Sequence, residues 1–115
     1  MVQVHFKVWI EEKGKVLFGE GRLDLLKAVA ESGSLAGAAR QLSMSYRAAW
    51  GRLRASEERL GFNLVERSEQ GRRAVRLTEQ GRRLMERYQA LEEEAARFAA
   101  KAEKQWNKEL AALRG

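Results

Sequence analysis

The last third of the chain, from Thr78 onward, carries a helical pattern that nothing interrupts. The 115-residue sequence contains no proline, and it contains no glycine between Gly81 and Gly115. The Thr78 hydroxyl can cap the start of a helix, which then runs to about Leu113, roughly 50 Å at 1.5 Å per residue. The chain is long enough for one modest domain and not for two. The apolar side of so long a helix cannot be covered by one small core.

Apolar and small residues recur along this stretch with spacings of 4-3-4-3-4, which is typical of a coiled coil. Trp106, Leu110 and Leu113 continue the stripe with a changed spacing that would locally unwind a supercoil. The first two turns can pack on their own domain, but the rest needs a partner helix. We therefore expect a homodimer. The residues predicted for its dimerisation seam are Leu84, Tyr88, Leu91, Ala95, Phe98 and Ala102.

The cysteine and histidine counts exclude most enzyme chemistry. With no Cys and only His5, the chain cannot build a disulfide, a thiolate nucleophile, a zinc finger, a multi-histidine metal site or a histidine-based triad. Glu57 and Glu58 are adjacent on a predicted helix, so they do not face one another. We expect no catalytic residue, no metal site and no cofactor. No apolar run exceeds four residues and no secretory signal is present, so we expect a cytoplasmic protein with no membrane partner.

The net charge of +6 is confined to the middle of the sequence. Residues 40–83 hold eleven basic residues, all of them arginine, and five acidic ones, while the segments on either side are neutral. The planar guanidinium makes paired contacts with phosphate or guanine that a lysine ammonium cannot make. A solvated arginine-rich surface is one interpretation, and a polyanionic partner is the favoured one.

The N-terminal residues alternate in polarity with a period of two. Val4, Phe6, Val8 and Ile10 share one face, which predicts a half-buried strand over Gln3–Ile10. Residues 11–14 are typical of a turn, and residues 15–18 can return as a second strand. The first unit is therefore predicted to be a β-hairpin.

Three helices are predicted to follow this hairpin. The first ends at residues 32–33, where a glycine can close it. Ser34 can cap a second, short helix that ends near Leu42, and Ser45 can cap a third that reaches about Leu60. Ala38 and Ala39 are small residues where the second and third helices must cross, since larger side chains would push them apart. This arrangement predicts a helix-turn-helix.

The third helix has two different faces. Its apolar residues fall within one arc that includes Trp50, which we expect to pack rather than to read DNA. The opposite face carries arginines and small residues, which let a helix lie close to a surface such as the DNA major groove. An alanine-rich helix without a ligand is the alternative. The DNA contacts expected from this region are Ser34, Ser45, Tyr46, Arg47, Ala48, Gly51 and Arg52.

A second hairpin is predicted after the third helix. Residues 63–67 and 74–77 favour strands, and the polar loop between them carries arginines at its tip. A solvated turn would explain this loop, but beside a helix-turn-helix a positive hairpin is better explained as a wing that grips phosphates or the minor groove. We expect Arg67, Arg72 and Arg73 to make those contacts.

Several of these segments together carry a family resemblance. They are Gly19-Glu20-Gly21-Arg22, Leu25-Leu26, Ser32-Gly33-Ser34-Leu35, Ala38-Ala39, Ser45-Tyr46-Arg47-Ala48-Ala49-Trp50, Leu64-Val65-Glu66-Arg67 and Leu77-Thr78. Over about residues 4–100 the chain resembles the DNA-binding domain of ModE-type molybdate-responsive regulators, and the S-Y-x-x-A-W element is the most specific part of the match. LysR-type regulators are similar more distantly and lack that element. The resemblance implies a winged-helix transcription regulator that dimerises through its long helix and reads DNA with Ser45, Tyr46 and Arg47.

The sequence departs from the ModE pattern in two places. Its wing loop, residues 68–73, is shorter and more charged. The molybdate-binding domains of that family should follow the long helix, whereas the sequence ends at Gly115. We therefore expect either a stand-alone regulator without the effector domain or an effector-sensing partner chain.

Together these patterns predict an α+β fold in one continuous domain. Residues 1–77 form a winged helix-turn-helix with an N-terminal β-hairpin, and residues 78–115 form the long dimerisation helix. We expect a homodimeric regulator that binds double-stranded DNA of defined sequence. The alternative is a coiled-coil adaptor whose arginine-rich surface meets an acidic protein or RNA, and it would show no preference among DNA sequences.

Overall fold

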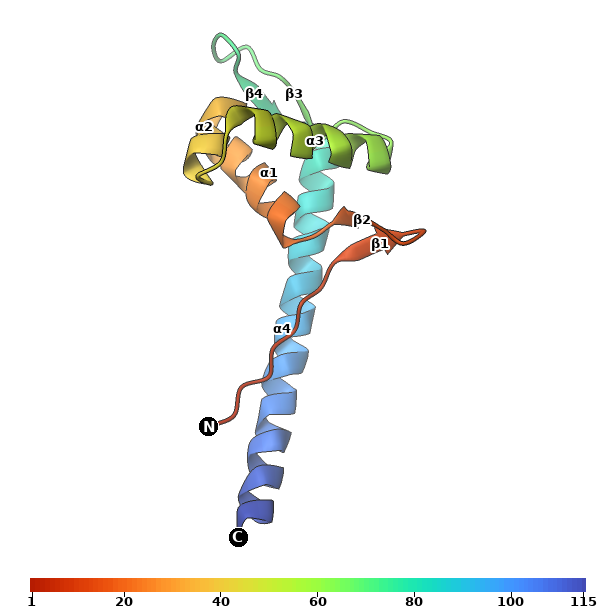
Figure 1. The fold of residues 1–115 in the computed structure, drawn as a ribbon, viewed down its shortest axis with the longest axis vertical. Coiled ribbons are helices and arrows are strands. Elements are labelled where there is room, and N and C mark those ends of the chain that lie inside the picture. The colour runs from red at the N-terminus through yellow and green to blue at the C-terminus, as the bar shows by residue number, and fades with distance from the viewer. The chain divides into compact units, whose positions relative to one another are not determined.

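The computed structural model describes all 115 residues, which divide into two compact units. Residues 9–88 form the winged-helix unit, and residues 1–8 together with 89–115 form the C-terminal unit. None of the helices combines the length and apolar character needed to cross a bilayer. In chain order the elements are β1 (Ile10–Glu12), β2 (Lys15–Phe18), α1 (Glu20–Ser32), α2 (Leu35–Gln41), α3 (Tyr46–Leu60), β3 (Val65–Arg67), β4 (Val75–Leu77) and α4 (Glu79–Arg114) (Figure 1).

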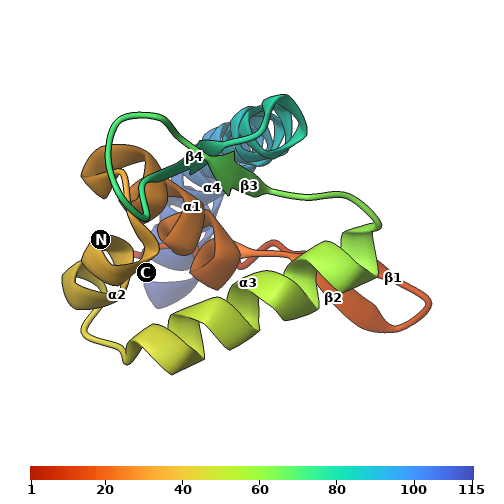
Figure 2. The same ribbon diagram turned by 90° about the horizontal axis from the view of Figure 1, so that it is seen from above.

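Helix α1 is the centre of the winged-helix unit. It packs against α2, α3 and β4 (Figure 2), and the apolar side chains of these elements form one core. The small residues predicted at the crossing of α2 and α3, Ala38 and Ala39, are both buried. This arrangement, with its two hairpins, confirms the predicted winged helix-turn-helix. The core residues from β2 to β3 are Phe18, Leu23, Leu25, Leu26, Ala28, Val29, Leu35, Ala38, Ala39, Ala49, Leu53 and Leu64.

The helix boundaries follow the predicted capping residues. The Ser34 hydroxyl accepts the Gly37 N–H at 2.9 Å at the start of α2, and the Ser45 hydroxyl accepts a backbone N–H at 3.0 Å at the start of α3. Gly33 and Gly61 close α1 and α3 with left-handed φ angles of 75° and 84°. These angles explain why both helices end at glycine, which adopts them without steric cost.

The first hairpin confirms its prediction only in part. Lys13 and Gly14 form its two-residue turn, and both have positive φ angles, 54° and 79°. The strand predicted over Gln3–Ile10 is wrong in extent, because only Ile10–Glu12 pairs with β2. β2 has four residues, so the earlier part of the alternating segment has no strand to pair with. Residues 1–8 belong instead to the C-terminal unit.

In the C-terminal unit the N-terminal segment lies along α4 (Figure 1). The backbone N–H groups of Val2 and Val4 donate to Asn107 Oδ1 at 2.7 Å and to Glu103 Oε2 at 3.2 Å. Val2, Val4 and Val8 are therefore half-buried, although the segment forms no β-ladder. Backbone donors at alternate residues are satisfied by helix side chains.

The predicted second hairpin is present as β3 and β4, paired antiparallel with Glu66 opposite Arg76. Its base is fixed at both ends. Glu57 Oε2 on α3 accepts the N–H of Leu64 at 2.8 Å. Thr78 donates through its hydroxyl to the Asn63 carbonyl at 2.6 Å and accepts the Gly81 N–H at 2.9 Å, so it also caps α4 as predicted. The wing is therefore held by α3 and by the first turn of α4.

Tyr88 departs from the predicted dimerisation seam. Its side chain is 1% exposed, and its ring meets the Phe18 ring edge-on with centroids 5.1 Å apart. Tyr88 is thus a core residue of the winged-helix unit, because the first turns of α4 cover the side of the core at β2. Its assignment to an intermolecular seam is wrong, and the alternative that the first two turns of the stripe pack on their own domain holds for this residue.

Candidate nucleic-acid interface

Helix α3 presents one buried and one exposed face. Ala49, Leu53 and Ser56 are buried at 0%, 4% and 1% exposure, which fixes the inward side of the helix. In Figure 2, α3 runs along one edge of the winged-helix unit, so its other side is open. The residues on that open side are Arg47, Ala48, Gly51, Arg52 and Arg54, and all are exposed. The small residues leave room between the arginines for another surface to approach.

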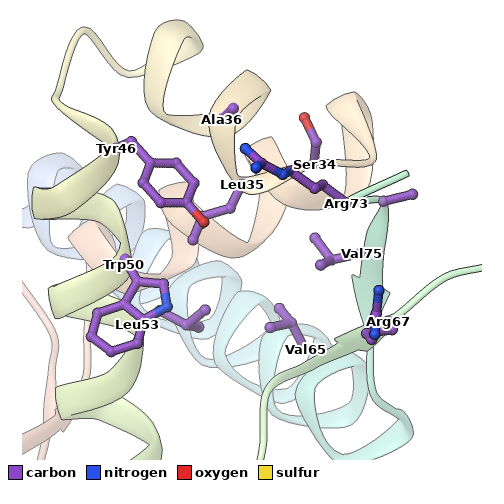
Figure 3. Close-up of a pocket in the computed structure, with 11 residues that line it drawn as sticks. Ser34, Leu35, Ala36, Tyr46, Trp50, Leu53, Val65, Arg67, Arg73 and Val75 are labelled. Atoms are coloured by element: carbon purple, nitrogen blue, oxygen red, sulfur yellow. The ribbon is translucent and has the colours of Figure 1, made fainter. Parts of the chain in front are cut away.

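A groove separates α3 from the wing (Figure 3). It has a volume of about 540 Å³, and its walls come from the start of α2, from α3 and from both wing strands. Leu35, Leu53, Val65 and Val75 supply its apolar lining, and no carboxylate lines it. The groove combines an apolar floor with the cationic side chains of the wing.

Two aromatic side chains of α3 border this groove. Tyr46 is 55% exposed and Trp50 is 49% exposed, so the expectation that Trp50 packs in the core is wrong. Figure 3 shows both rings on the α3 side, across from Val65 and Val75. The guanidinium of Arg54 lies 5.3 Å from the centroid of the Trp50 ring, a cation–π contact. A helical wheel places Trp50 near the core edge, but it does not show the space between the helix and the wing.

The wing arginines differ in their partners. Arg76 pairs with Glu66 across the strands, with Nε 2.9 Å from Oε2. Arg67 and Arg73 line the groove, and neither they nor the exposed Arg72 forms an ion pair. Arg73 has a left-handed φ of 62°, which helps to set the direction of the tip. The three wing arginines expected to contact DNA are therefore the ones that form no ion pair.

The predicted DNA contacts of the helix-turn-helix lie near one another. Ser34 and Tyr46 both line the groove, and Ser45 starts the helix that carries Arg47 and the other exposed residues. The Ser34 and Ser45 hydroxyls are engaged in capping. No group of three or more His, Cys, Asp or Glu side chains is arranged to hold a metal ion. The helix-turn-helix and the groove beside it therefore present positive charge at the surface.

The C-terminal unit leaves much of its apolar stripe uncovered. Phe98, Trp106 and Leu113 are 64%, 53% and 71% exposed, while Leu91, Ala95 and Ala102 are half-buried. The Phe6 ring meets the Phe98 ring edge-on, with centroids 5.4 Å apart, and Phe6 itself is half-exposed. Leu84 is half-buried within the winged-helix unit.

A capped helix with small residues and arginines, beside an arginine-bearing hairpin, defines a winged-helix DNA-binding protein. Residues 21–82 match the family described as bacterial regulatory helix-turn-helix proteins of the lysR family. The chain belongs to this family. It carries the DNA-binding helix-turn-helix of these regulators, and the family is not a class of enzymes.

Two curated relatives support the ModE-like resemblance. The molybdenum-pterin-binding protein MopB of Rhodobacter capsulatus is 33% identical over 98 residues, which cover 84% of this chain and 36% of MopB. MopA of the same organism is 34% identical over 85 residues, covering 72% of this chain and 32% of MopA. The chain thus spans about a third of the length of these two relatives.

Solved structures of LysR-type proteins share the fold. The CbnR DNA-binding domain, crystallised in a complex with DNA, is 33% identical with a TM-score of 0.57, covering 71% of this chain and 91% of that one. Full-length LysG from Corynebacterium glutamicum is 28% identical with a TM-score of 0.55, covering 73% of this chain and 28% of that one. These matches confirm the fold predicted from the sequence.

Proposed function

We propose that this regulator binds double-stranded DNA as a homodimer, with the N-terminal part of α3 in the major groove. Ser45, Tyr46, Arg47, Ala48, Gly51 and Arg52 lie against the DNA, and the arginines among them supply base or phosphate contacts. Ser34 approaches the same DNA strand from the start of α2. Transcription is then controlled by occupancy of a site at the promoter.

The observation that carries this proposal is the shared exposure of Arg47, Ala48 and Gly51 on the open side of α3. On a solvent-facing helix surface, long polar side chains would be solvated better than an alanine, and a glycine would lower the stability of the helix. A surface that lies against a base-pair edge benefits from both small residues, because each omitted side chain lets the backbone approach more closely. The DNA-bound structure of the CbnR domain supports the same partner.

We place the wing on the phosphate backbone beside that major groove. Arg67 and Arg73 carry uncompensated charge at the groove between α3 and the wing, and Arg72 extends it at the tip. Contacts of this kind position a protein on DNA without reading its sequence.

The homodimer rests on the uncovered part of α4. Leu91, Ala95, Phe98 and Ala102 follow a heptad spacing, and the exposed Phe98 and Trp106 are the largest apolar side chains along it. Two-fold symmetry then brings two copies of α3 to successive major grooves, about 34–36 Å or a multiple apart. The preferred site is therefore an inverted repeat.

The test of this function is selection of bound duplexes from a random DNA pool, followed by titration of the winning site. We expect an enriched inverted repeat. Binding to all duplexes without sequence preference, or only to RNA, would show that the arginine-rich surface serves an adaptor.

Arg47→Ala tests the reading helix directly. Its guanidinium lies at the N-terminal end of the exposed face of α3, where one base or phosphate contact is worth about 1–3 kcal/mol. We expect specific affinity to fall by that amount in a fluorescence titration. Arg40→Ala on α2, a similarly exposed arginine outside the proposed contact set, is the matched control. Unchanged affinity and sequence preference in Arg47→Ala would remove Arg47 from the interface.

A further inference from the structure

Three arginines gather on the flank of α3 that faces away from the wing. Arg22 comes from the first turn of α1, Arg52 from the middle of α3 and Arg59 from its last turn. Arg22 Nε donates to Ser56 Oγ at 2.9 Å, and Ser56 Oγ donates in turn to the carbonyl of Arg52 at 2.9 Å. Arg59 Nη1 donates to the carbonyl of Val16 on β2 at 3.1 Å. We call Arg22, Arg52 and Arg59 the flank cluster.

No acidic side chain compensates the flank cluster. The two ion pairs of the structure join Arg76 to Glu66 and Arg82 to Glu86, and none of the three arginines takes part. Partial burial lowers the pKa of the Arg22 guanidinium below its ordinary value, and the charges of Arg59 and Arg52 lower it further. Arginine remains protonated at neutral pH, so three cations are held close together against their mutual repulsion. A bound anion would relieve that repulsion.

The flank cluster and the wing lie on opposite sides of α3. At 100° per residue, Arg52 and Arg59 point about 200° and 180° away from Trp50, which borders the wing groove. The bond from Arg59 to β2 places the flank cluster on the side of the first hairpin. Figure 1 shows the β3–β4 tip and the β1–β2 hairpin on opposite sides of α3.

The dimensions of the DNA major groove indicate which ligand the flank cluster can reach. A helix with its side chains is about 10–12 Å across, and the major groove is about 12 Å wide, so a helix in the groove faces a phosphate backbone on each flank. The wing serves one of those backbones. We propose that the flank cluster binds phosphate groups of the other backbone, with Arg22 and Arg59 as contacts that the helix-turn-helix pattern does not predict. This proposal rests on the proposed DNA-binding function.

Ethylation interference tests the proposal, because it maps the phosphates whose modification blocks binding. We expect wild-type protein to show interference on both backbones that border each major groove of the site. In the double variant Arg22→Gln with Arg59→Gln, interference should disappear from the backbone on the hairpin side and persist on the wing side. The slope of log affinity against log salt should become shallower by about 0.9 for each lost phosphate contact, or about 1.8 per protomer. Arg87→Gln, which removes one exposed charge from α4, should keep both patterns.

Arg22 donates a hydrogen bond to the buried Ser56, so its substitution can also destabilise the fold. Thermal melting therefore establishes whether each variant is folded before its DNA binding is interpreted. If Arg22→Gln with Arg59→Gln is unfolded, the exposed pair Arg52→Gln with Arg59→Gln is used and should lose the same interference. A folded variant with the wild-type pattern and slope would overturn the proposal, whereas wild-type protein that binds no duplex would overturn the proposed function. Inorganic phosphate is titrated at constant ionic strength to test the other source of this anion. Saturation that is lost in the variant, with unchanged interference on DNA, would assign the flank cluster to free phosphate and contradict the proposal.

Discussion

At the scale of single residues, the fold depends on a few positions where only one side-chain size fits. Gly81 is the clearest of these. A Cβ atom built at Gly81 would collide with the carbonyl oxygen of Leu64, which belongs to the backbone at the base of the wing. The N–H of Gly81 also donates to the Thr78 hydroxyl. At Gly81, the backbone of the first turn of α4 therefore lies directly against the backbone at the base of the wing.

Gly81→Ala should destabilise the protein, although alanine normally stabilises a helix by up to about 1 kcal/mol relative to glycine. The Leu64 backbone must shift to admit the methyl group, and overpacking of this kind costs about 1–3 kcal/mol. Chemical denaturation measures the free energy of unfolding. Gly51→Ala on α3 is the control, since nothing lies within 4 Å of its added Cβ, and it should be neutral or stabilising. Gly81→Ala as stable as wild type would contradict the close approach.

Residue-level prediction from the sequence succeeded where local chemistry decides the outcome. Ser34, Ser45 and Thr78 cap their helices as predicted, because a hydroxyl before a helix serves backbone donors only a few residues away. It failed for Trp50 and Tyr88, whose exposure depends on elements distant in sequence. Trp50 faces a groove made with the wing, and Tyr88 packs on Phe18 of β2. Periodicity within one helix cannot distinguish these environments.

At the scale of elements, the helices and the wing were predictable, but the first strand was not. Alternation over Gln3–Ile10 predicts a half-buried face, and Val4, Val8 and Ile10 are half-buried, whereas Phe6 on the same face is 51% exposed. The covering element is α4 and not a second strand, as the bonds from Val2 and Val4 to its side chains show. An alternation of polar and apolar residues with a period of two indicates which side chains are covered, but it does not indicate whether a strand or a helix covers them.

The wing arginines are expected to contribute to DNA affinity but not to sequence preference. Arg72→Ala with Arg73→Ala should weaken binding to specific and random duplexes by similar factors, because phosphate contacts do not distinguish sequences. The salt slope should fall by about 1.8 per protomer if each arginine touches one phosphate. Arg76→Ala is the control, since Glu66 already compensates that charge. A wild-type slope in the double variant, measured across a salt series, would show that the wing does not touch DNA.

At the scale of the whole molecule, the excess positive charge and the apolar stripe of α4 lie in different parts of the chain. The excess positive charge lies in residues 40–83, within the winged-helix unit, whereas the segment after residue 83 is neutral and carries the exposed Phe98, Trp106 and Leu113. A protein surface that binds DNA requires positive charge, whereas a surface that pairs with another helix requires exposed apolar side chains. The distribution of arginine and of apolar residues along the sequence is enough to indicate this division. The partner of the apolar stripe cannot be recognised within one chain, because two-fold pairing depends on contacts that a single copy does not make.

Pairing through α4 predicts that Phe98→Asp with Trp106→Asp gives a monomer. Both side chains are more than half exposed in one protomer, so the protomer should stay folded. In a dimer each substitution would bury a carboxylate in an apolar seam, at a cost of several kcal/mol. Light scattering should then report the 13.1 kDa mass of one chain, against twice that mass for the wild type. Each monomer can hold only one half-site, so affinity for the full inverted repeat should fall to that for a half-site.

The control for this prediction adds the same charge to the opposite side of α4. Ala100 and Ala111 are exposed and lie about 200° and 220° around the helix from Phe98. Ala100→Asp with Ala111→Asp should therefore remain dimeric and bind the full site as tightly as wild type. A folded, dimeric Phe98→Asp, Trp106→Asp variant would place the dimer contact outside the stripe. A monomeric variant that binds the inverted repeat undiminished would instead rule out the two-fold mode of binding, since loss of one protomer must remove half of the contacts that such a mode requires.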